Sequence, residues 1–410
     1  MNERVLFAGN SSYANKGCEA IVRGTREILL RSLGDGVAVD HAYFPTDSKD
    51  DRAIETDPGI HHVVLPRWKK FSAPWFRFQL AGRLDRARIW NYYCPPAVRA
   101  VSAADVVLMI GGDNYTLDYG VPRLFYSFHE MCLRARKPTV LWGASIGPFT
   151  KNPEFEKRAA EQMRRMDLIL ARESITIDYL ASIGVSENVR RVNDPSFCMT
   201  PVKPNLDPEL EAFLARGCIG INLSPLVGLY ELPNIEAWIE RAKEVLAHLH
   251  ATLGLAILLV PHVIDRDGQN IMKCDDLFMK AAAADLIAAG LPVRIAPASL
   301  SAAQVKWVIG QTQVYAGARM HSTAAGASTH VPTVFITYSN KATGMARDIY
   351  GDDSMLVDGR KISKERLAEV IGTSHRNREQ ISAYLRARMP DYASLSWAAG
   401  DYVRDLLRAA

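Results

Sequence analysis

The stretch VYAGARMHSTAAGASTHVPTVFITYSNKATGM, residues 314–345, indicates the fold of the chain. It opens with an apolar run over 314–316, which predicts a short buried strand. A tight turn at 317–318 leads into a helix of small residues over 322–327. A second apolar run over 331–336 predicts another buried strand. Strands that alternate with helices in this way predict an α/β domain with a parallel sheet.

Three side chains of this stretch come just after its two predicted strands. Arg319 and His321 follow the first strand at the start of the helix, and Lys341 follows the second strand in a polar loop. Open parallel sheets bind ligands outside the carboxyl ends of their strands, and a helix N-terminus favours anions. The pattern therefore predicts a small anion held by cations beside a titratable imidazole. The alternatives are an ordinary surface ion pair, a helix-start histidine without a chemical role and a solvated lysine.

The composition is that of a globular protein. The 410 residues predict two domains, and 48% hydrophobic with 23% charged residues is typical of such chains. A net charge of +4 requires no nucleic-acid partner. The six cysteines are scattered without a CxxC pair, which argues against a cysteine zinc site and favours a reducing compartment. The N-terminus does not read as a secretion signal and no apolar run reaches transmembrane length, so we expect a cytoplasmic protein.

Strand-end loops in the N-terminal half carry glycine and polar residues. One predicted helix opens with Asn15-Lys16-Gly17-Cys18-Glu19-Ala20, where a glycine lets a ligand approach backbone N–H groups. A buried strand over 104–110 runs into Gly111-Gly112-Asp113-Asn114, whose polar side chains can bond hydroxyls. A plain helix start and a plain turn are the alternatives. The dinucleotide motif GxGxxG is absent, so no Rossmann cofactor is predicted.

Two parallel-sheet domains are expected on either side of a proline-marked linker. The linker covers 201–207 and contains Pro201 and Pro204. Strand-end loops of both domains are expected to line a cleft, which is the general architecture of GT-B glycosyltransferases. The predicted parts are a Rossmann-like domain over 1–200, a second one over 208–372 and a helical tail over 373–410.

The segment from Pro66 to Tyr93 is basic and aromatic. It carries seven basic residues against the single acid Asp85, interleaved with tryptophan, phenylalanine and tyrosine. This composition suits the interface of an anionic membrane or stacking on sugar rings or bases. A helix that packs its aromatic residues inward and solvates its charges is an equal alternative.

A weaker cluster follows the buried strand predicted at 256–260. His262, Asp265 and Asp267 lie in the loop after this strand. They suit a metal ion or a contact with carbohydrate or phosphate equally well, so no metal site is predicted.

Six segments, in this order along the chain, resemble the polysaccharide pyruvyl transferase family. The resemblance extends from the N-terminus to about Met345. It excludes the segment 66–93 and the C-terminal tail, where we expect acceptor specificity to lie. The segments are NKGCEA at 15–20, IGGD at 110–113, WGASIGP at 142–148, ARES at 171–174, NDPS at 193–196 and GARMHS at 317–322.

The resemblance implies a GT-B-like fold and transfer of pyruvate from phosphoenolpyruvate to two hydroxyls of a sugar. The product would be a ketal, made during assembly of a bacterial surface polysaccharide or glycolipid. In such enzymes residues that correspond to Arg172, Arg319 and His321 surround phosphoenolpyruvate, and a lysine after the next strand corresponds to Lys341. We expect Ser322 to join these donor contacts.

In this reading His321 protonates the methylene carbon of the donor, and the cations hold its phosphate and carboxylate. Neither a cofactor nor a metal is required, because cationic side chains supply the electrostatic stabilisation. Asp113 or Glu19 is a candidate base for a hydroxyl proton. The acceptor sugar is expected to contact Asn15, Glu19, Gly112, Asp113 and Asn114.

Two other functions fit parts of the pattern: a GT-B glycosyltransferase that uses a sugar nucleotide, and a non-catalytic subunit that binds glycan or membrane. We favour pyruvyl transfer, because it alone accounts for the ordered set of segments. The expected partners are phosphoenolpyruvate and a sugar acceptor, lipid-linked or not, with no nucleic acid. The segment 66–93 would make a peripheral contact at the inner face of the membrane. The acceptor sugar and the oligomeric state stay open.

Overall fold

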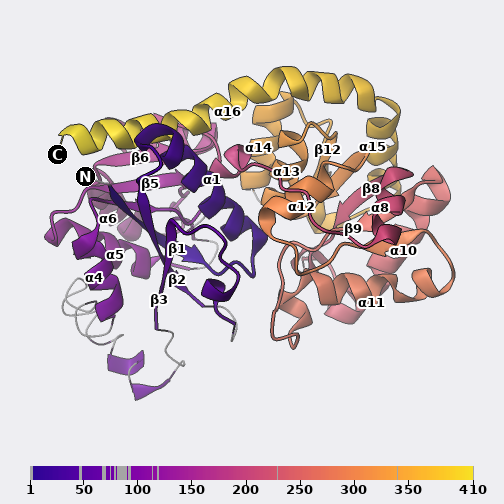
Figure 1. The fold of residues 1–410 in the computed structure, drawn as a ribbon, viewed down its shortest axis with the longest axis horizontal. Helices are drawn as coiled ribbons and strands as arrows, with labels where there is room; N and C mark the ends of the chain where they lie inside the picture. The colour runs from indigo at the N-terminus through magenta and orange to yellow at the C-terminus, as the bar shows by residue number, and fades with distance from the viewer. Residues whose placement is uncertain are drawn as a thin grey trace. The chain divides into compact units, whose positions relative to one another are not determined.

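The computed structural model shows two α/β units, each built on one parallel sheet (Figure 1). Unit 1 comprises Met1–Ser12, Gly24–Cys198 and Leu395–Ala410, and unit 2 comprises Tyr13–Arg23 and Met199–Ser394. The domain bounds predicted above stay a prediction. The structure describes residues 3–45, 49–66, 71–73, 75–77, 80, 90, 94–112, 114–117, 120–228, 230–338 and 340–409, without the side chains of 340 and 341.

Unit 1 contains a seven-stranded sheet in the order β3-β2-β1-β4-β5-β6-β7. Neighbouring strands are parallel throughout this sheet. The strand order reverses between β1 and β4, and sheets of this kind bind ligands at the carboxyl ends beside such a reversal. The strands are β1 (Arg4–Ser11), β2 (Ala38–Phe44), β3 (Ile60–Val64), β4 (Val106–Met109), β5 (Thr139–Ala144), β6 (Leu168–Ala171) and β7 (Val189–Arg191).

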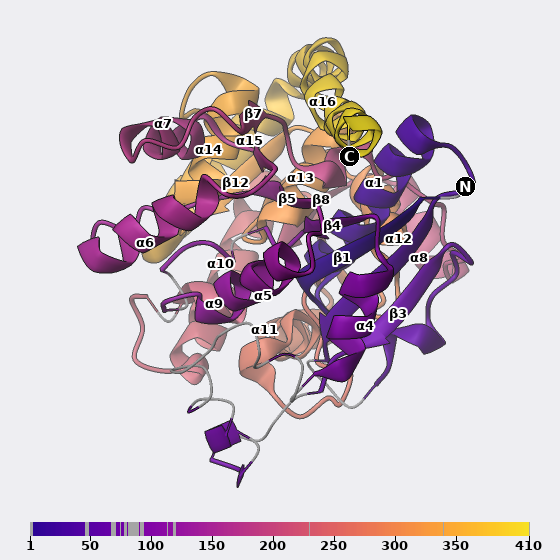
Figure 2. The same ribbon diagram turned by 90° about the vertical axis from the view of Figure 1, so that its left-hand side faces the viewer.

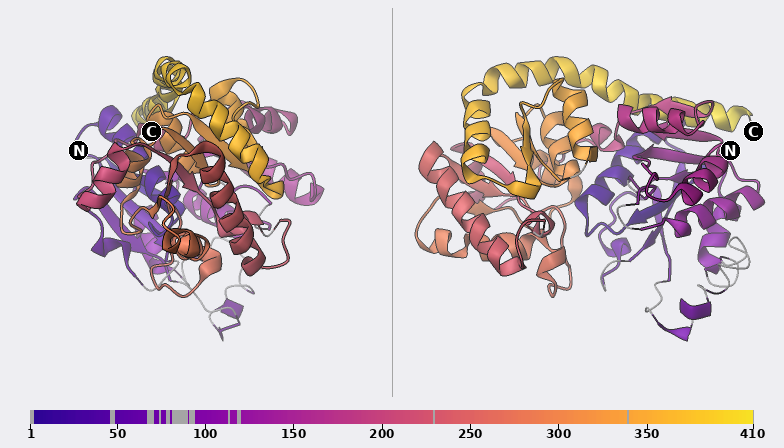
Figure 3. Two further views of the ribbon diagram at one scale, coloured as in Figure 1. Left: turned by 90° about the vertical axis from the view of Figure 1, so that its right-hand side faces the viewer. Right: turned by 180° about the vertical axis from the view of Figure 1, so that it is seen from behind.

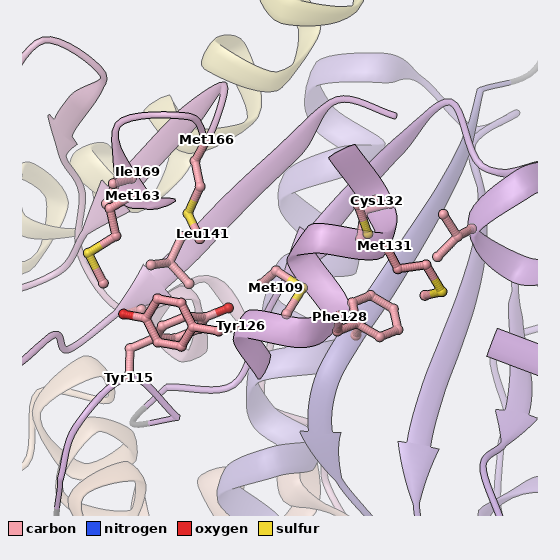
Figure 4. Packing of buried hydrophobic residues seen from close by; sticks show 14 of the residues in the cluster. Met109, Tyr115, Tyr126, Phe128, Met131, Cys132, Leu141, Met163, Met166 and Ile169 are labelled. Carbon is pink, nitrogen blue, oxygen red and sulfur yellow. The ribbon is translucent and has the colours of Figure 1, made fainter. Parts of the chain in front are cut away.

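Helices cover both faces of this sheet. The helices with residues in unit 1 are α1 (Lys16–Leu33), α4 (Pro95–Ala103), α5 (Arg123–Arg134), α6 (Pro153–Met163), α7 (Ser174–Ser182) and α16 (Arg378–Ala409), and the short turns are η1 (Asp51–Ala53) and η2 (Pro195–Cys198). Successive side chains of a strand point to opposite faces. Met109 and Leu141 face a core formed with α4, α5 and α6 (Figures 2 and 4). Trp142 points to the other face, where its indole N–H donates to Thr25 Oγ1 of α1 over 2.9 Å.

Unit 2 contains a six-stranded parallel sheet in the order β10-β9-β8-β11-β12-β13. Its order reverses between β8 and β11, so the same rule places its ligand crevice at the ends of these two strands. The strands are β8 (Cys218–Asn222), β9 (Ala256–Leu259), β10 (Val293–Ile295), β11 (Val314–Gly317), β12 (Thr333–Thr337) and β13 (Leu356–Asp358).

Two hydrophobic cores lie on opposite faces of this second sheet, and helices flank the sheet in the ribbon views of Figure 3. On one face, side chains such as Ile219 and Ile257 pack with α10, α11 and α15. On the other face, Leu258 and Tyr315 pack with α8 and α12. The helices are α8 (Pro208–Ala215), α9 (Pro225–Gly228), α10 (Ile235–Leu253), α11 (Asp275–Ala288), α12 (Ala302–Ile309), α13 (Met320–Ser328), α14 (Asn340–Tyr350) and α15 (Lys364–Arg376), with short turns η3 (Ile271–Lys273) and η4 (Gly359–Lys361).

Two helices contribute residues to both units. The first turns of α1 belong to unit 2 and the rest of this helix to unit 1. The long C-terminal helix α16, yellow in Figures 1 and 3, passes from unit 2 to unit 1 at Ser394. In the described part of the chain, no helix is both long and apolar enough to cross a membrane.

The predicted strands and helices are confirmed with a few differences. The strand β3 was not predicted, because two histidines interrupt its apolar run. Lys341 was expected in a loop and lies instead in the first turn of α14, whose sequence continues with alanine and threonine. The helix α11, which the sequence predicts over 276–289, begins one residue earlier, so Asp275 lies in its first turn. This last difference matters for the site.

Candidate functional site

The end of β11 in unit 2 is held by a buried asparagine from the neighbouring strand. Asn222 is the last residue of β8 and is fully buried. Its Oδ1 accepts a hydrogen bond from the backbone N–H of Arg319 over 3.1 Å. Its Nδ2 donates to the carbonyl of Val260, which follows β9, over 2.9 Å. One side chain thus fixes three strand ends at the predicted ligand crevice.

Arg319 extends from this strand end to a buried carboxylate. Its Nη2 lies 2.8 Å from Asp275 Oδ1, and its Nε lies 3.4 Å from Asp275 Oδ2. Asp275 opens α11, is fully buried, and also accepts the backbone N–H groups of His262 and Val263 over 3.1 and 3.0 Å. The Arg319 side chain keeps 15% of its surface exposed. The guanidinium is therefore oriented from within the protein and can be reached by a ligand from solvent.

His321 lies against the start of α1. It is the second residue of α13, for which Arg319 is the N-terminal cap. A Cβ atom on Gly17 would lie 2.5 Å from His321 Nδ1, so only glycine leaves room for the imidazole. Asn15 shapes this approach, because its Oδ1 accepts the N–H of Gly17 over 2.9 Å. The NKGCEA and GARMHS segments meet here within unit 2.

A second histidine and a lysine lie at the same place. The backbone N–H of Lys16 donates to the carbonyl of His262 over 2.9 Å. His262 is buried, and within the described residues neither of its ring nitrogens has a hydrogen-bond partner. Burial holds its pKa well below the usual histidine value, and the electrostatic effects of His321, Arg319 and Lys16 lower this pKa further. His262 is therefore a neutral imidazole at neutral pH.

The cluster of His262 with Asp265 and Asp267 does not form a metal site. The carboxylate of Asp265 instead accepts the backbone N–H groups of Asp267, Gln269 and Asn270, at 2.7–3.1 Å, and so closes its own loop. Across the described ranges, no group of three histidine, cysteine or acidic side chains is placed to hold a metal ion. Of the three residues, His262 alone is brought to the Arg319 site.

Glu19 is committed to contacts within unit 2. Its Oε2 accepts the N–H of Ala302, at the start of α12, over 3.0 Å and lies 3.5 Å from Lys16 Nζ. Its Oε1 lies 3.7 Å from Arg23. Because Glu19 is only 2% exposed, these contacts disfavour its service as a base for a sugar hydroxyl. They fit a role in joining α1 to α12.

The remaining residues predicted to contact the donor or the acceptor differ in their surroundings. Ser322 is fully buried, and its hydroxyl donates to the carbonyl of Arg319 over 2.7 Å, which steadies the first turn of α13. The side chain of Lys341 lies outside the described residues, as does Asp113. Asn114, in unit 1, donates from Nδ2 to the carbonyl of Gly9.

Arg172 lies in unit 1 and is 2% exposed. Its Nη1 is 2.7 Å from Asp194 Oδ2, its Nε is 2.7 Å from Glu173 Oε1, and both Nε and Nη2 donate to Ser145 Oγ. A Cβ atom on Gly112 would come within 2.7 Å of its Nη1. The IGGD, WGASIGP, ARES and NDPS segments thus meet around one buried guanidinium.

The structure therefore sorts the predicted residues into two groups. Arg319, His321, Ser322, Asn15 and Glu19 lie in unit 2, and Arg172, Gly112 and Asn114 lie in unit 1. The residues missed by sequence reasoning are those that orient the first group. Asp275 is 44 positions from Arg319, and no local pattern couples the two. An acidic residue in the first turn of a helix was the only signal, and it indicates a helix start in general.

Comparisons with known proteins identify the family of the chain. The family model described as polysaccharide pyruvyl transferase matches residues 15–340. The amylovoran biosynthesis protein AmsJ of Erwinia amylovora is 23% identical in an alignment of length 399 that covers 88% of this chain and 91% of that protein.

Two solved structures resemble the fold. A putative UDP-N-acetylglucosamine 2-epimerase of Listeria monocytogenes has a TM-score of 0.61 at 12% identity, over 98% of this chain and 95% of that one. Anabaena Alr3699/HepE, solved with UDP and glucose, has a TM-score of 0.57 at 11% identity over 100% of both chains. The two sheets and the long C-terminal helix make the fold GT-B-like. With the model match covering most of its length, the chain belongs to the polysaccharide pyruvyl transferase family.

Proposed function

We propose that the protein transfers pyruvate from phosphoenolpyruvate to two hydroxyls of a sugar and forms a cyclic ketal during assembly of a bacterial surface polysaccharide. The observation that carries this proposal is the arrangement at the end of β11. There Arg319 is oriented by the buried Asp275, and His321 lies against Gly17. Membership of the family and the likeness to a polysaccharide biosynthesis protein support the same reaction class.

The donor subsite lies at the start of α13. Phosphoenolpyruvate carries a phosphate and a carboxylate, and the guanidinium fork of Arg319 matches either group. The N–H groups of a first helical turn add partial positive charge for an anion. Lys16 provides further positive charge close to His262. Two cations, Arg319 and Lys16, near the same imidazole suit a ligand that carries two anionic groups.

His321 supplies the proton in this proposal. The methylene carbon of phosphoenolpyruvate takes a proton from the imidazolium through its double-bond electrons, and a sugar hydroxyl adds to the neighbouring carbon as its own proton returns to the imidazole. The bond from that carbon to the phosphate oxygen then breaks, and its electron pair leaves with the phosphate. The second hydroxyl adds to the same carbon, and its proton passes to the released phosphate. The products are the ketal and inorganic phosphate, with no net oxidation or reduction.

Arg172 has a different role in this scheme. Its nitrogens already bond Glu173, Asp194 and Ser145 inside unit 1, so its contacts favour support of the strand ends over a direct grip on phosphoenolpyruvate. The predicted contacts of Arg172 and Lys341 with the donor, and of Gly112, Asp113 and Asn114 with the acceptor, stay predictions.

Isothermal calorimetry of the full-length protein tests the donor. We expect phosphoenolpyruvate to bind, Arg319→Ala to weaken binding by at least about tenfold, since hydrogen bonds to charged groups contribute about 1.5–3 kcal/mol, and Asp275→Asn to weaken it less. Arg347→Ala is the matched control, because Arg347 also pairs with an aspartate in unit 2 but is 58% exposed. Its binding should equal that of the wild type.

His321→Asn separates chemistry from binding. It should retain most of the affinity for phosphoenolpyruvate and lose release of inorganic phosphate in the presence of acceptor. Binding of UDP-glucose without phosphoenolpyruvate would overturn the donor assignment. Undiminished turnover in His321→Asn would refute the role of the imidazole as the acid.

A further inference from the structure

Unit 2 presents an exposed aromatic ring that the proposed reaction does not yet use. Tyr230 is 59% exposed. Its ring centroid lies 5.7 Å from that of Tyr338, and the two ring planes are inclined by 34°. Tyr338 is partly buried against the core of unit 2. The inner ring therefore supports the outer one, and one face of the pair is left to solvent.

The position of the two rings follows from the sheet topology. Tyr230 comes after β8 and α9, and Tyr338 is the residue directly after β12. The strand β11 lies between β8 and β12 in the sheet. The two strands that flank it are therefore about 10 Å apart. Because the two rings nevertheless meet, their loops approach each other across the carboxyl end of β11. Arg319 begins the anion site at that same strand end.

The loop that presents Tyr230 is anchored in the core. The indole N–H of Trp238, a residue that is 1% exposed, donates to the carbonyl of Ser224 over 3.0 Å. A Cβ atom on Gly228 would lie 2.1 Å from Trp238 Cγ, so the turn packs directly on the indole. The N–H of Tyr230 closes this turn on the carbonyl of Val227 over 3.3 Å. The exposed ring thus stands on a fixed support.

We infer that Tyr230, backed by Tyr338, is a stacking subsite for the pyranose ring of the acceptor sugar. This inference rests on the proposed pyruvyl transfer and deepens it. An attacking hydroxyl must come within about 3–3.5 Å of the reacting carbon, so the acceptor binds beside Arg319 and His321. A pyranose has a face of C–H groups and a rim of hydroxyls. That face packs on an aromatic ring, while the hydroxyls point to the donor and to water.

Saturation-transfer NMR tests the subsite with defined probes. The probes are methyl β-D-glucopyranoside and methyl β-D-galactopyranoside, each of which offers two hydroxyls that a ketal can bridge. Irradiation of aromatic protons of the wild type and of Tyr230→Phe should saturate the C–H protons of the sugar ring. Tyr230→Ala should reduce this effect severalfold. Tyr384→Ala is the control, because it removes a tyrosine that is 43% exposed elsewhere in unit 2.

Kinetics and calorimetry separate this inference from the proposed function. Tyr230→Ala should raise the KM for glycoside about tenfold, the size of one aromatic stacking contact, and leave the Kd for phosphoenolpyruvate unchanged. Equal saturation of the glycosides by wild type and Tyr230→Ala would overturn the subsite even if pyruvyl transfer is demonstrated. Saturation of UDP without the glycosides would overturn it as well. Absence of phosphoenolpyruvate binding to the wild type would instead refute the reaction.

Discussion

Gly17→Ala is expected to separate the orientation of His321 from the stability of the fold. The new Cβ atom would lie 2.5 Å from Nδ1 and 3.0 Å from Cγ of His321, and 3.1 Å from Asn15 Oδ1. Ordinary contacts of a Cβ atom begin at 3.4 Å, so the imidazole must move by about 1 Å or rotate. Gly17 is not among the residues with positive φ, so alanine can adopt its backbone conformation.

The expected loss of activity is large and the loss of stability small. A displacement of about 1 Å in a catalytic group lowers kcat by about 10²-fold. Within a helix, alanine is favoured over glycine by about 0.5–1 kcal/mol, which offsets part of the strain around the displaced ring. The free energy of unfolding should therefore fall by less than about 1 kcal/mol. The Arg319–Asp275 pair is untouched, so the Kd for phosphoenolpyruvate should stay within about threefold of the wild type.

Phosphate release gives kcat, urea unfolding gives the free energy of unfolding, and calorimetry gives the Kd for phosphoenolpyruvate. Gly372→Ala is the matched control in the same unit, because its Cβ atom would meet only the ends of two flexible side chains, Leu253 at 2.9 Å and Arg376 at 3.5 Å. It should leave all three quantities nearly unchanged. If Gly17→Ala keeps the wild-type kcat, the contact between Gly17 and the imidazole does not set catalytic geometry, and the reasoning fails.

Three further predictions concern other parts of the chain. Arg172→Ala leaves the carboxylates of Glu173 and Asp194 buried without their cation, so the free energy of unfolding in urea should fall by about 3–5 kcal/mol. Wild-type stability with lost phosphoenolpyruvate affinity would instead support a direct donor contact. Burial, with the charge of Arg165, lowers the pKa of His129 to about 4 from 6.5. The unfolded chain therefore binds more protons, and stability should fall as pH drops from 6.5 to 4, by up to about 3 kcal/mol. His129→Gln should reduce this slope, and an identical slope would contradict the assignment. Neutralising Arg83, Arg86 and Arg88 should reduce co-sedimentation with anionic liposomes, because the segment 66–93 carries seven basic residues against one acid. Phe71 and Phe76, 71% and 55% exposed, are available for such contact, and unchanged co-sedimentation would remove the membrane interpretation.

Local patterns predicted most of the fold because parallel strands are buried on both faces. Such strands read as continuous apolar runs, as in VVLM of β4 and TVFIT of β12. The strand β3 escaped detection because His61 and His62 interrupt its pattern, and its place at the sheet edge tolerates them. The division of α1 and α16 between two units could not be predicted. An amphipathic pattern shows which face of a helix is apolar, but it does not indicate which hydrophobic core each turn packs against.

The candidate site was predicted in part for the same physical reason. Arg319 and His321 were found because topology alone places residues after β11 at the ligand edge of a parallel sheet. Asp275 and Asn222 were missed, since their roles depend on pairings across 44 and 97 positions. His262 was noticed for its residue type, in a weak cluster that suited a metal ion or a contact with carbohydrate or phosphate equally well. Its neighbours Lys16 and His321 come from distant segments, which lie near His262 only in the folded chain.

Two glycines show what a glycine in a strand-end loop can predict and what it cannot. Gly17 was interpreted as a place where a ligand approaches the backbone and Gly112 as a contact of the acceptor, and both positions do require close approach. The structure shows protein side chains there instead: the imidazole of His321 at Gly17 and the guanidinium of Arg172 at Gly112. A glycine in a strand-end loop therefore predicts that a bulky group lies against the backbone, without identifying the group. In unit 2 the missing side chain of Gly17 positions the imidazole of His321, the proposed acid. The ligand is then expected on the side of the imidazole that faces away from Gly17.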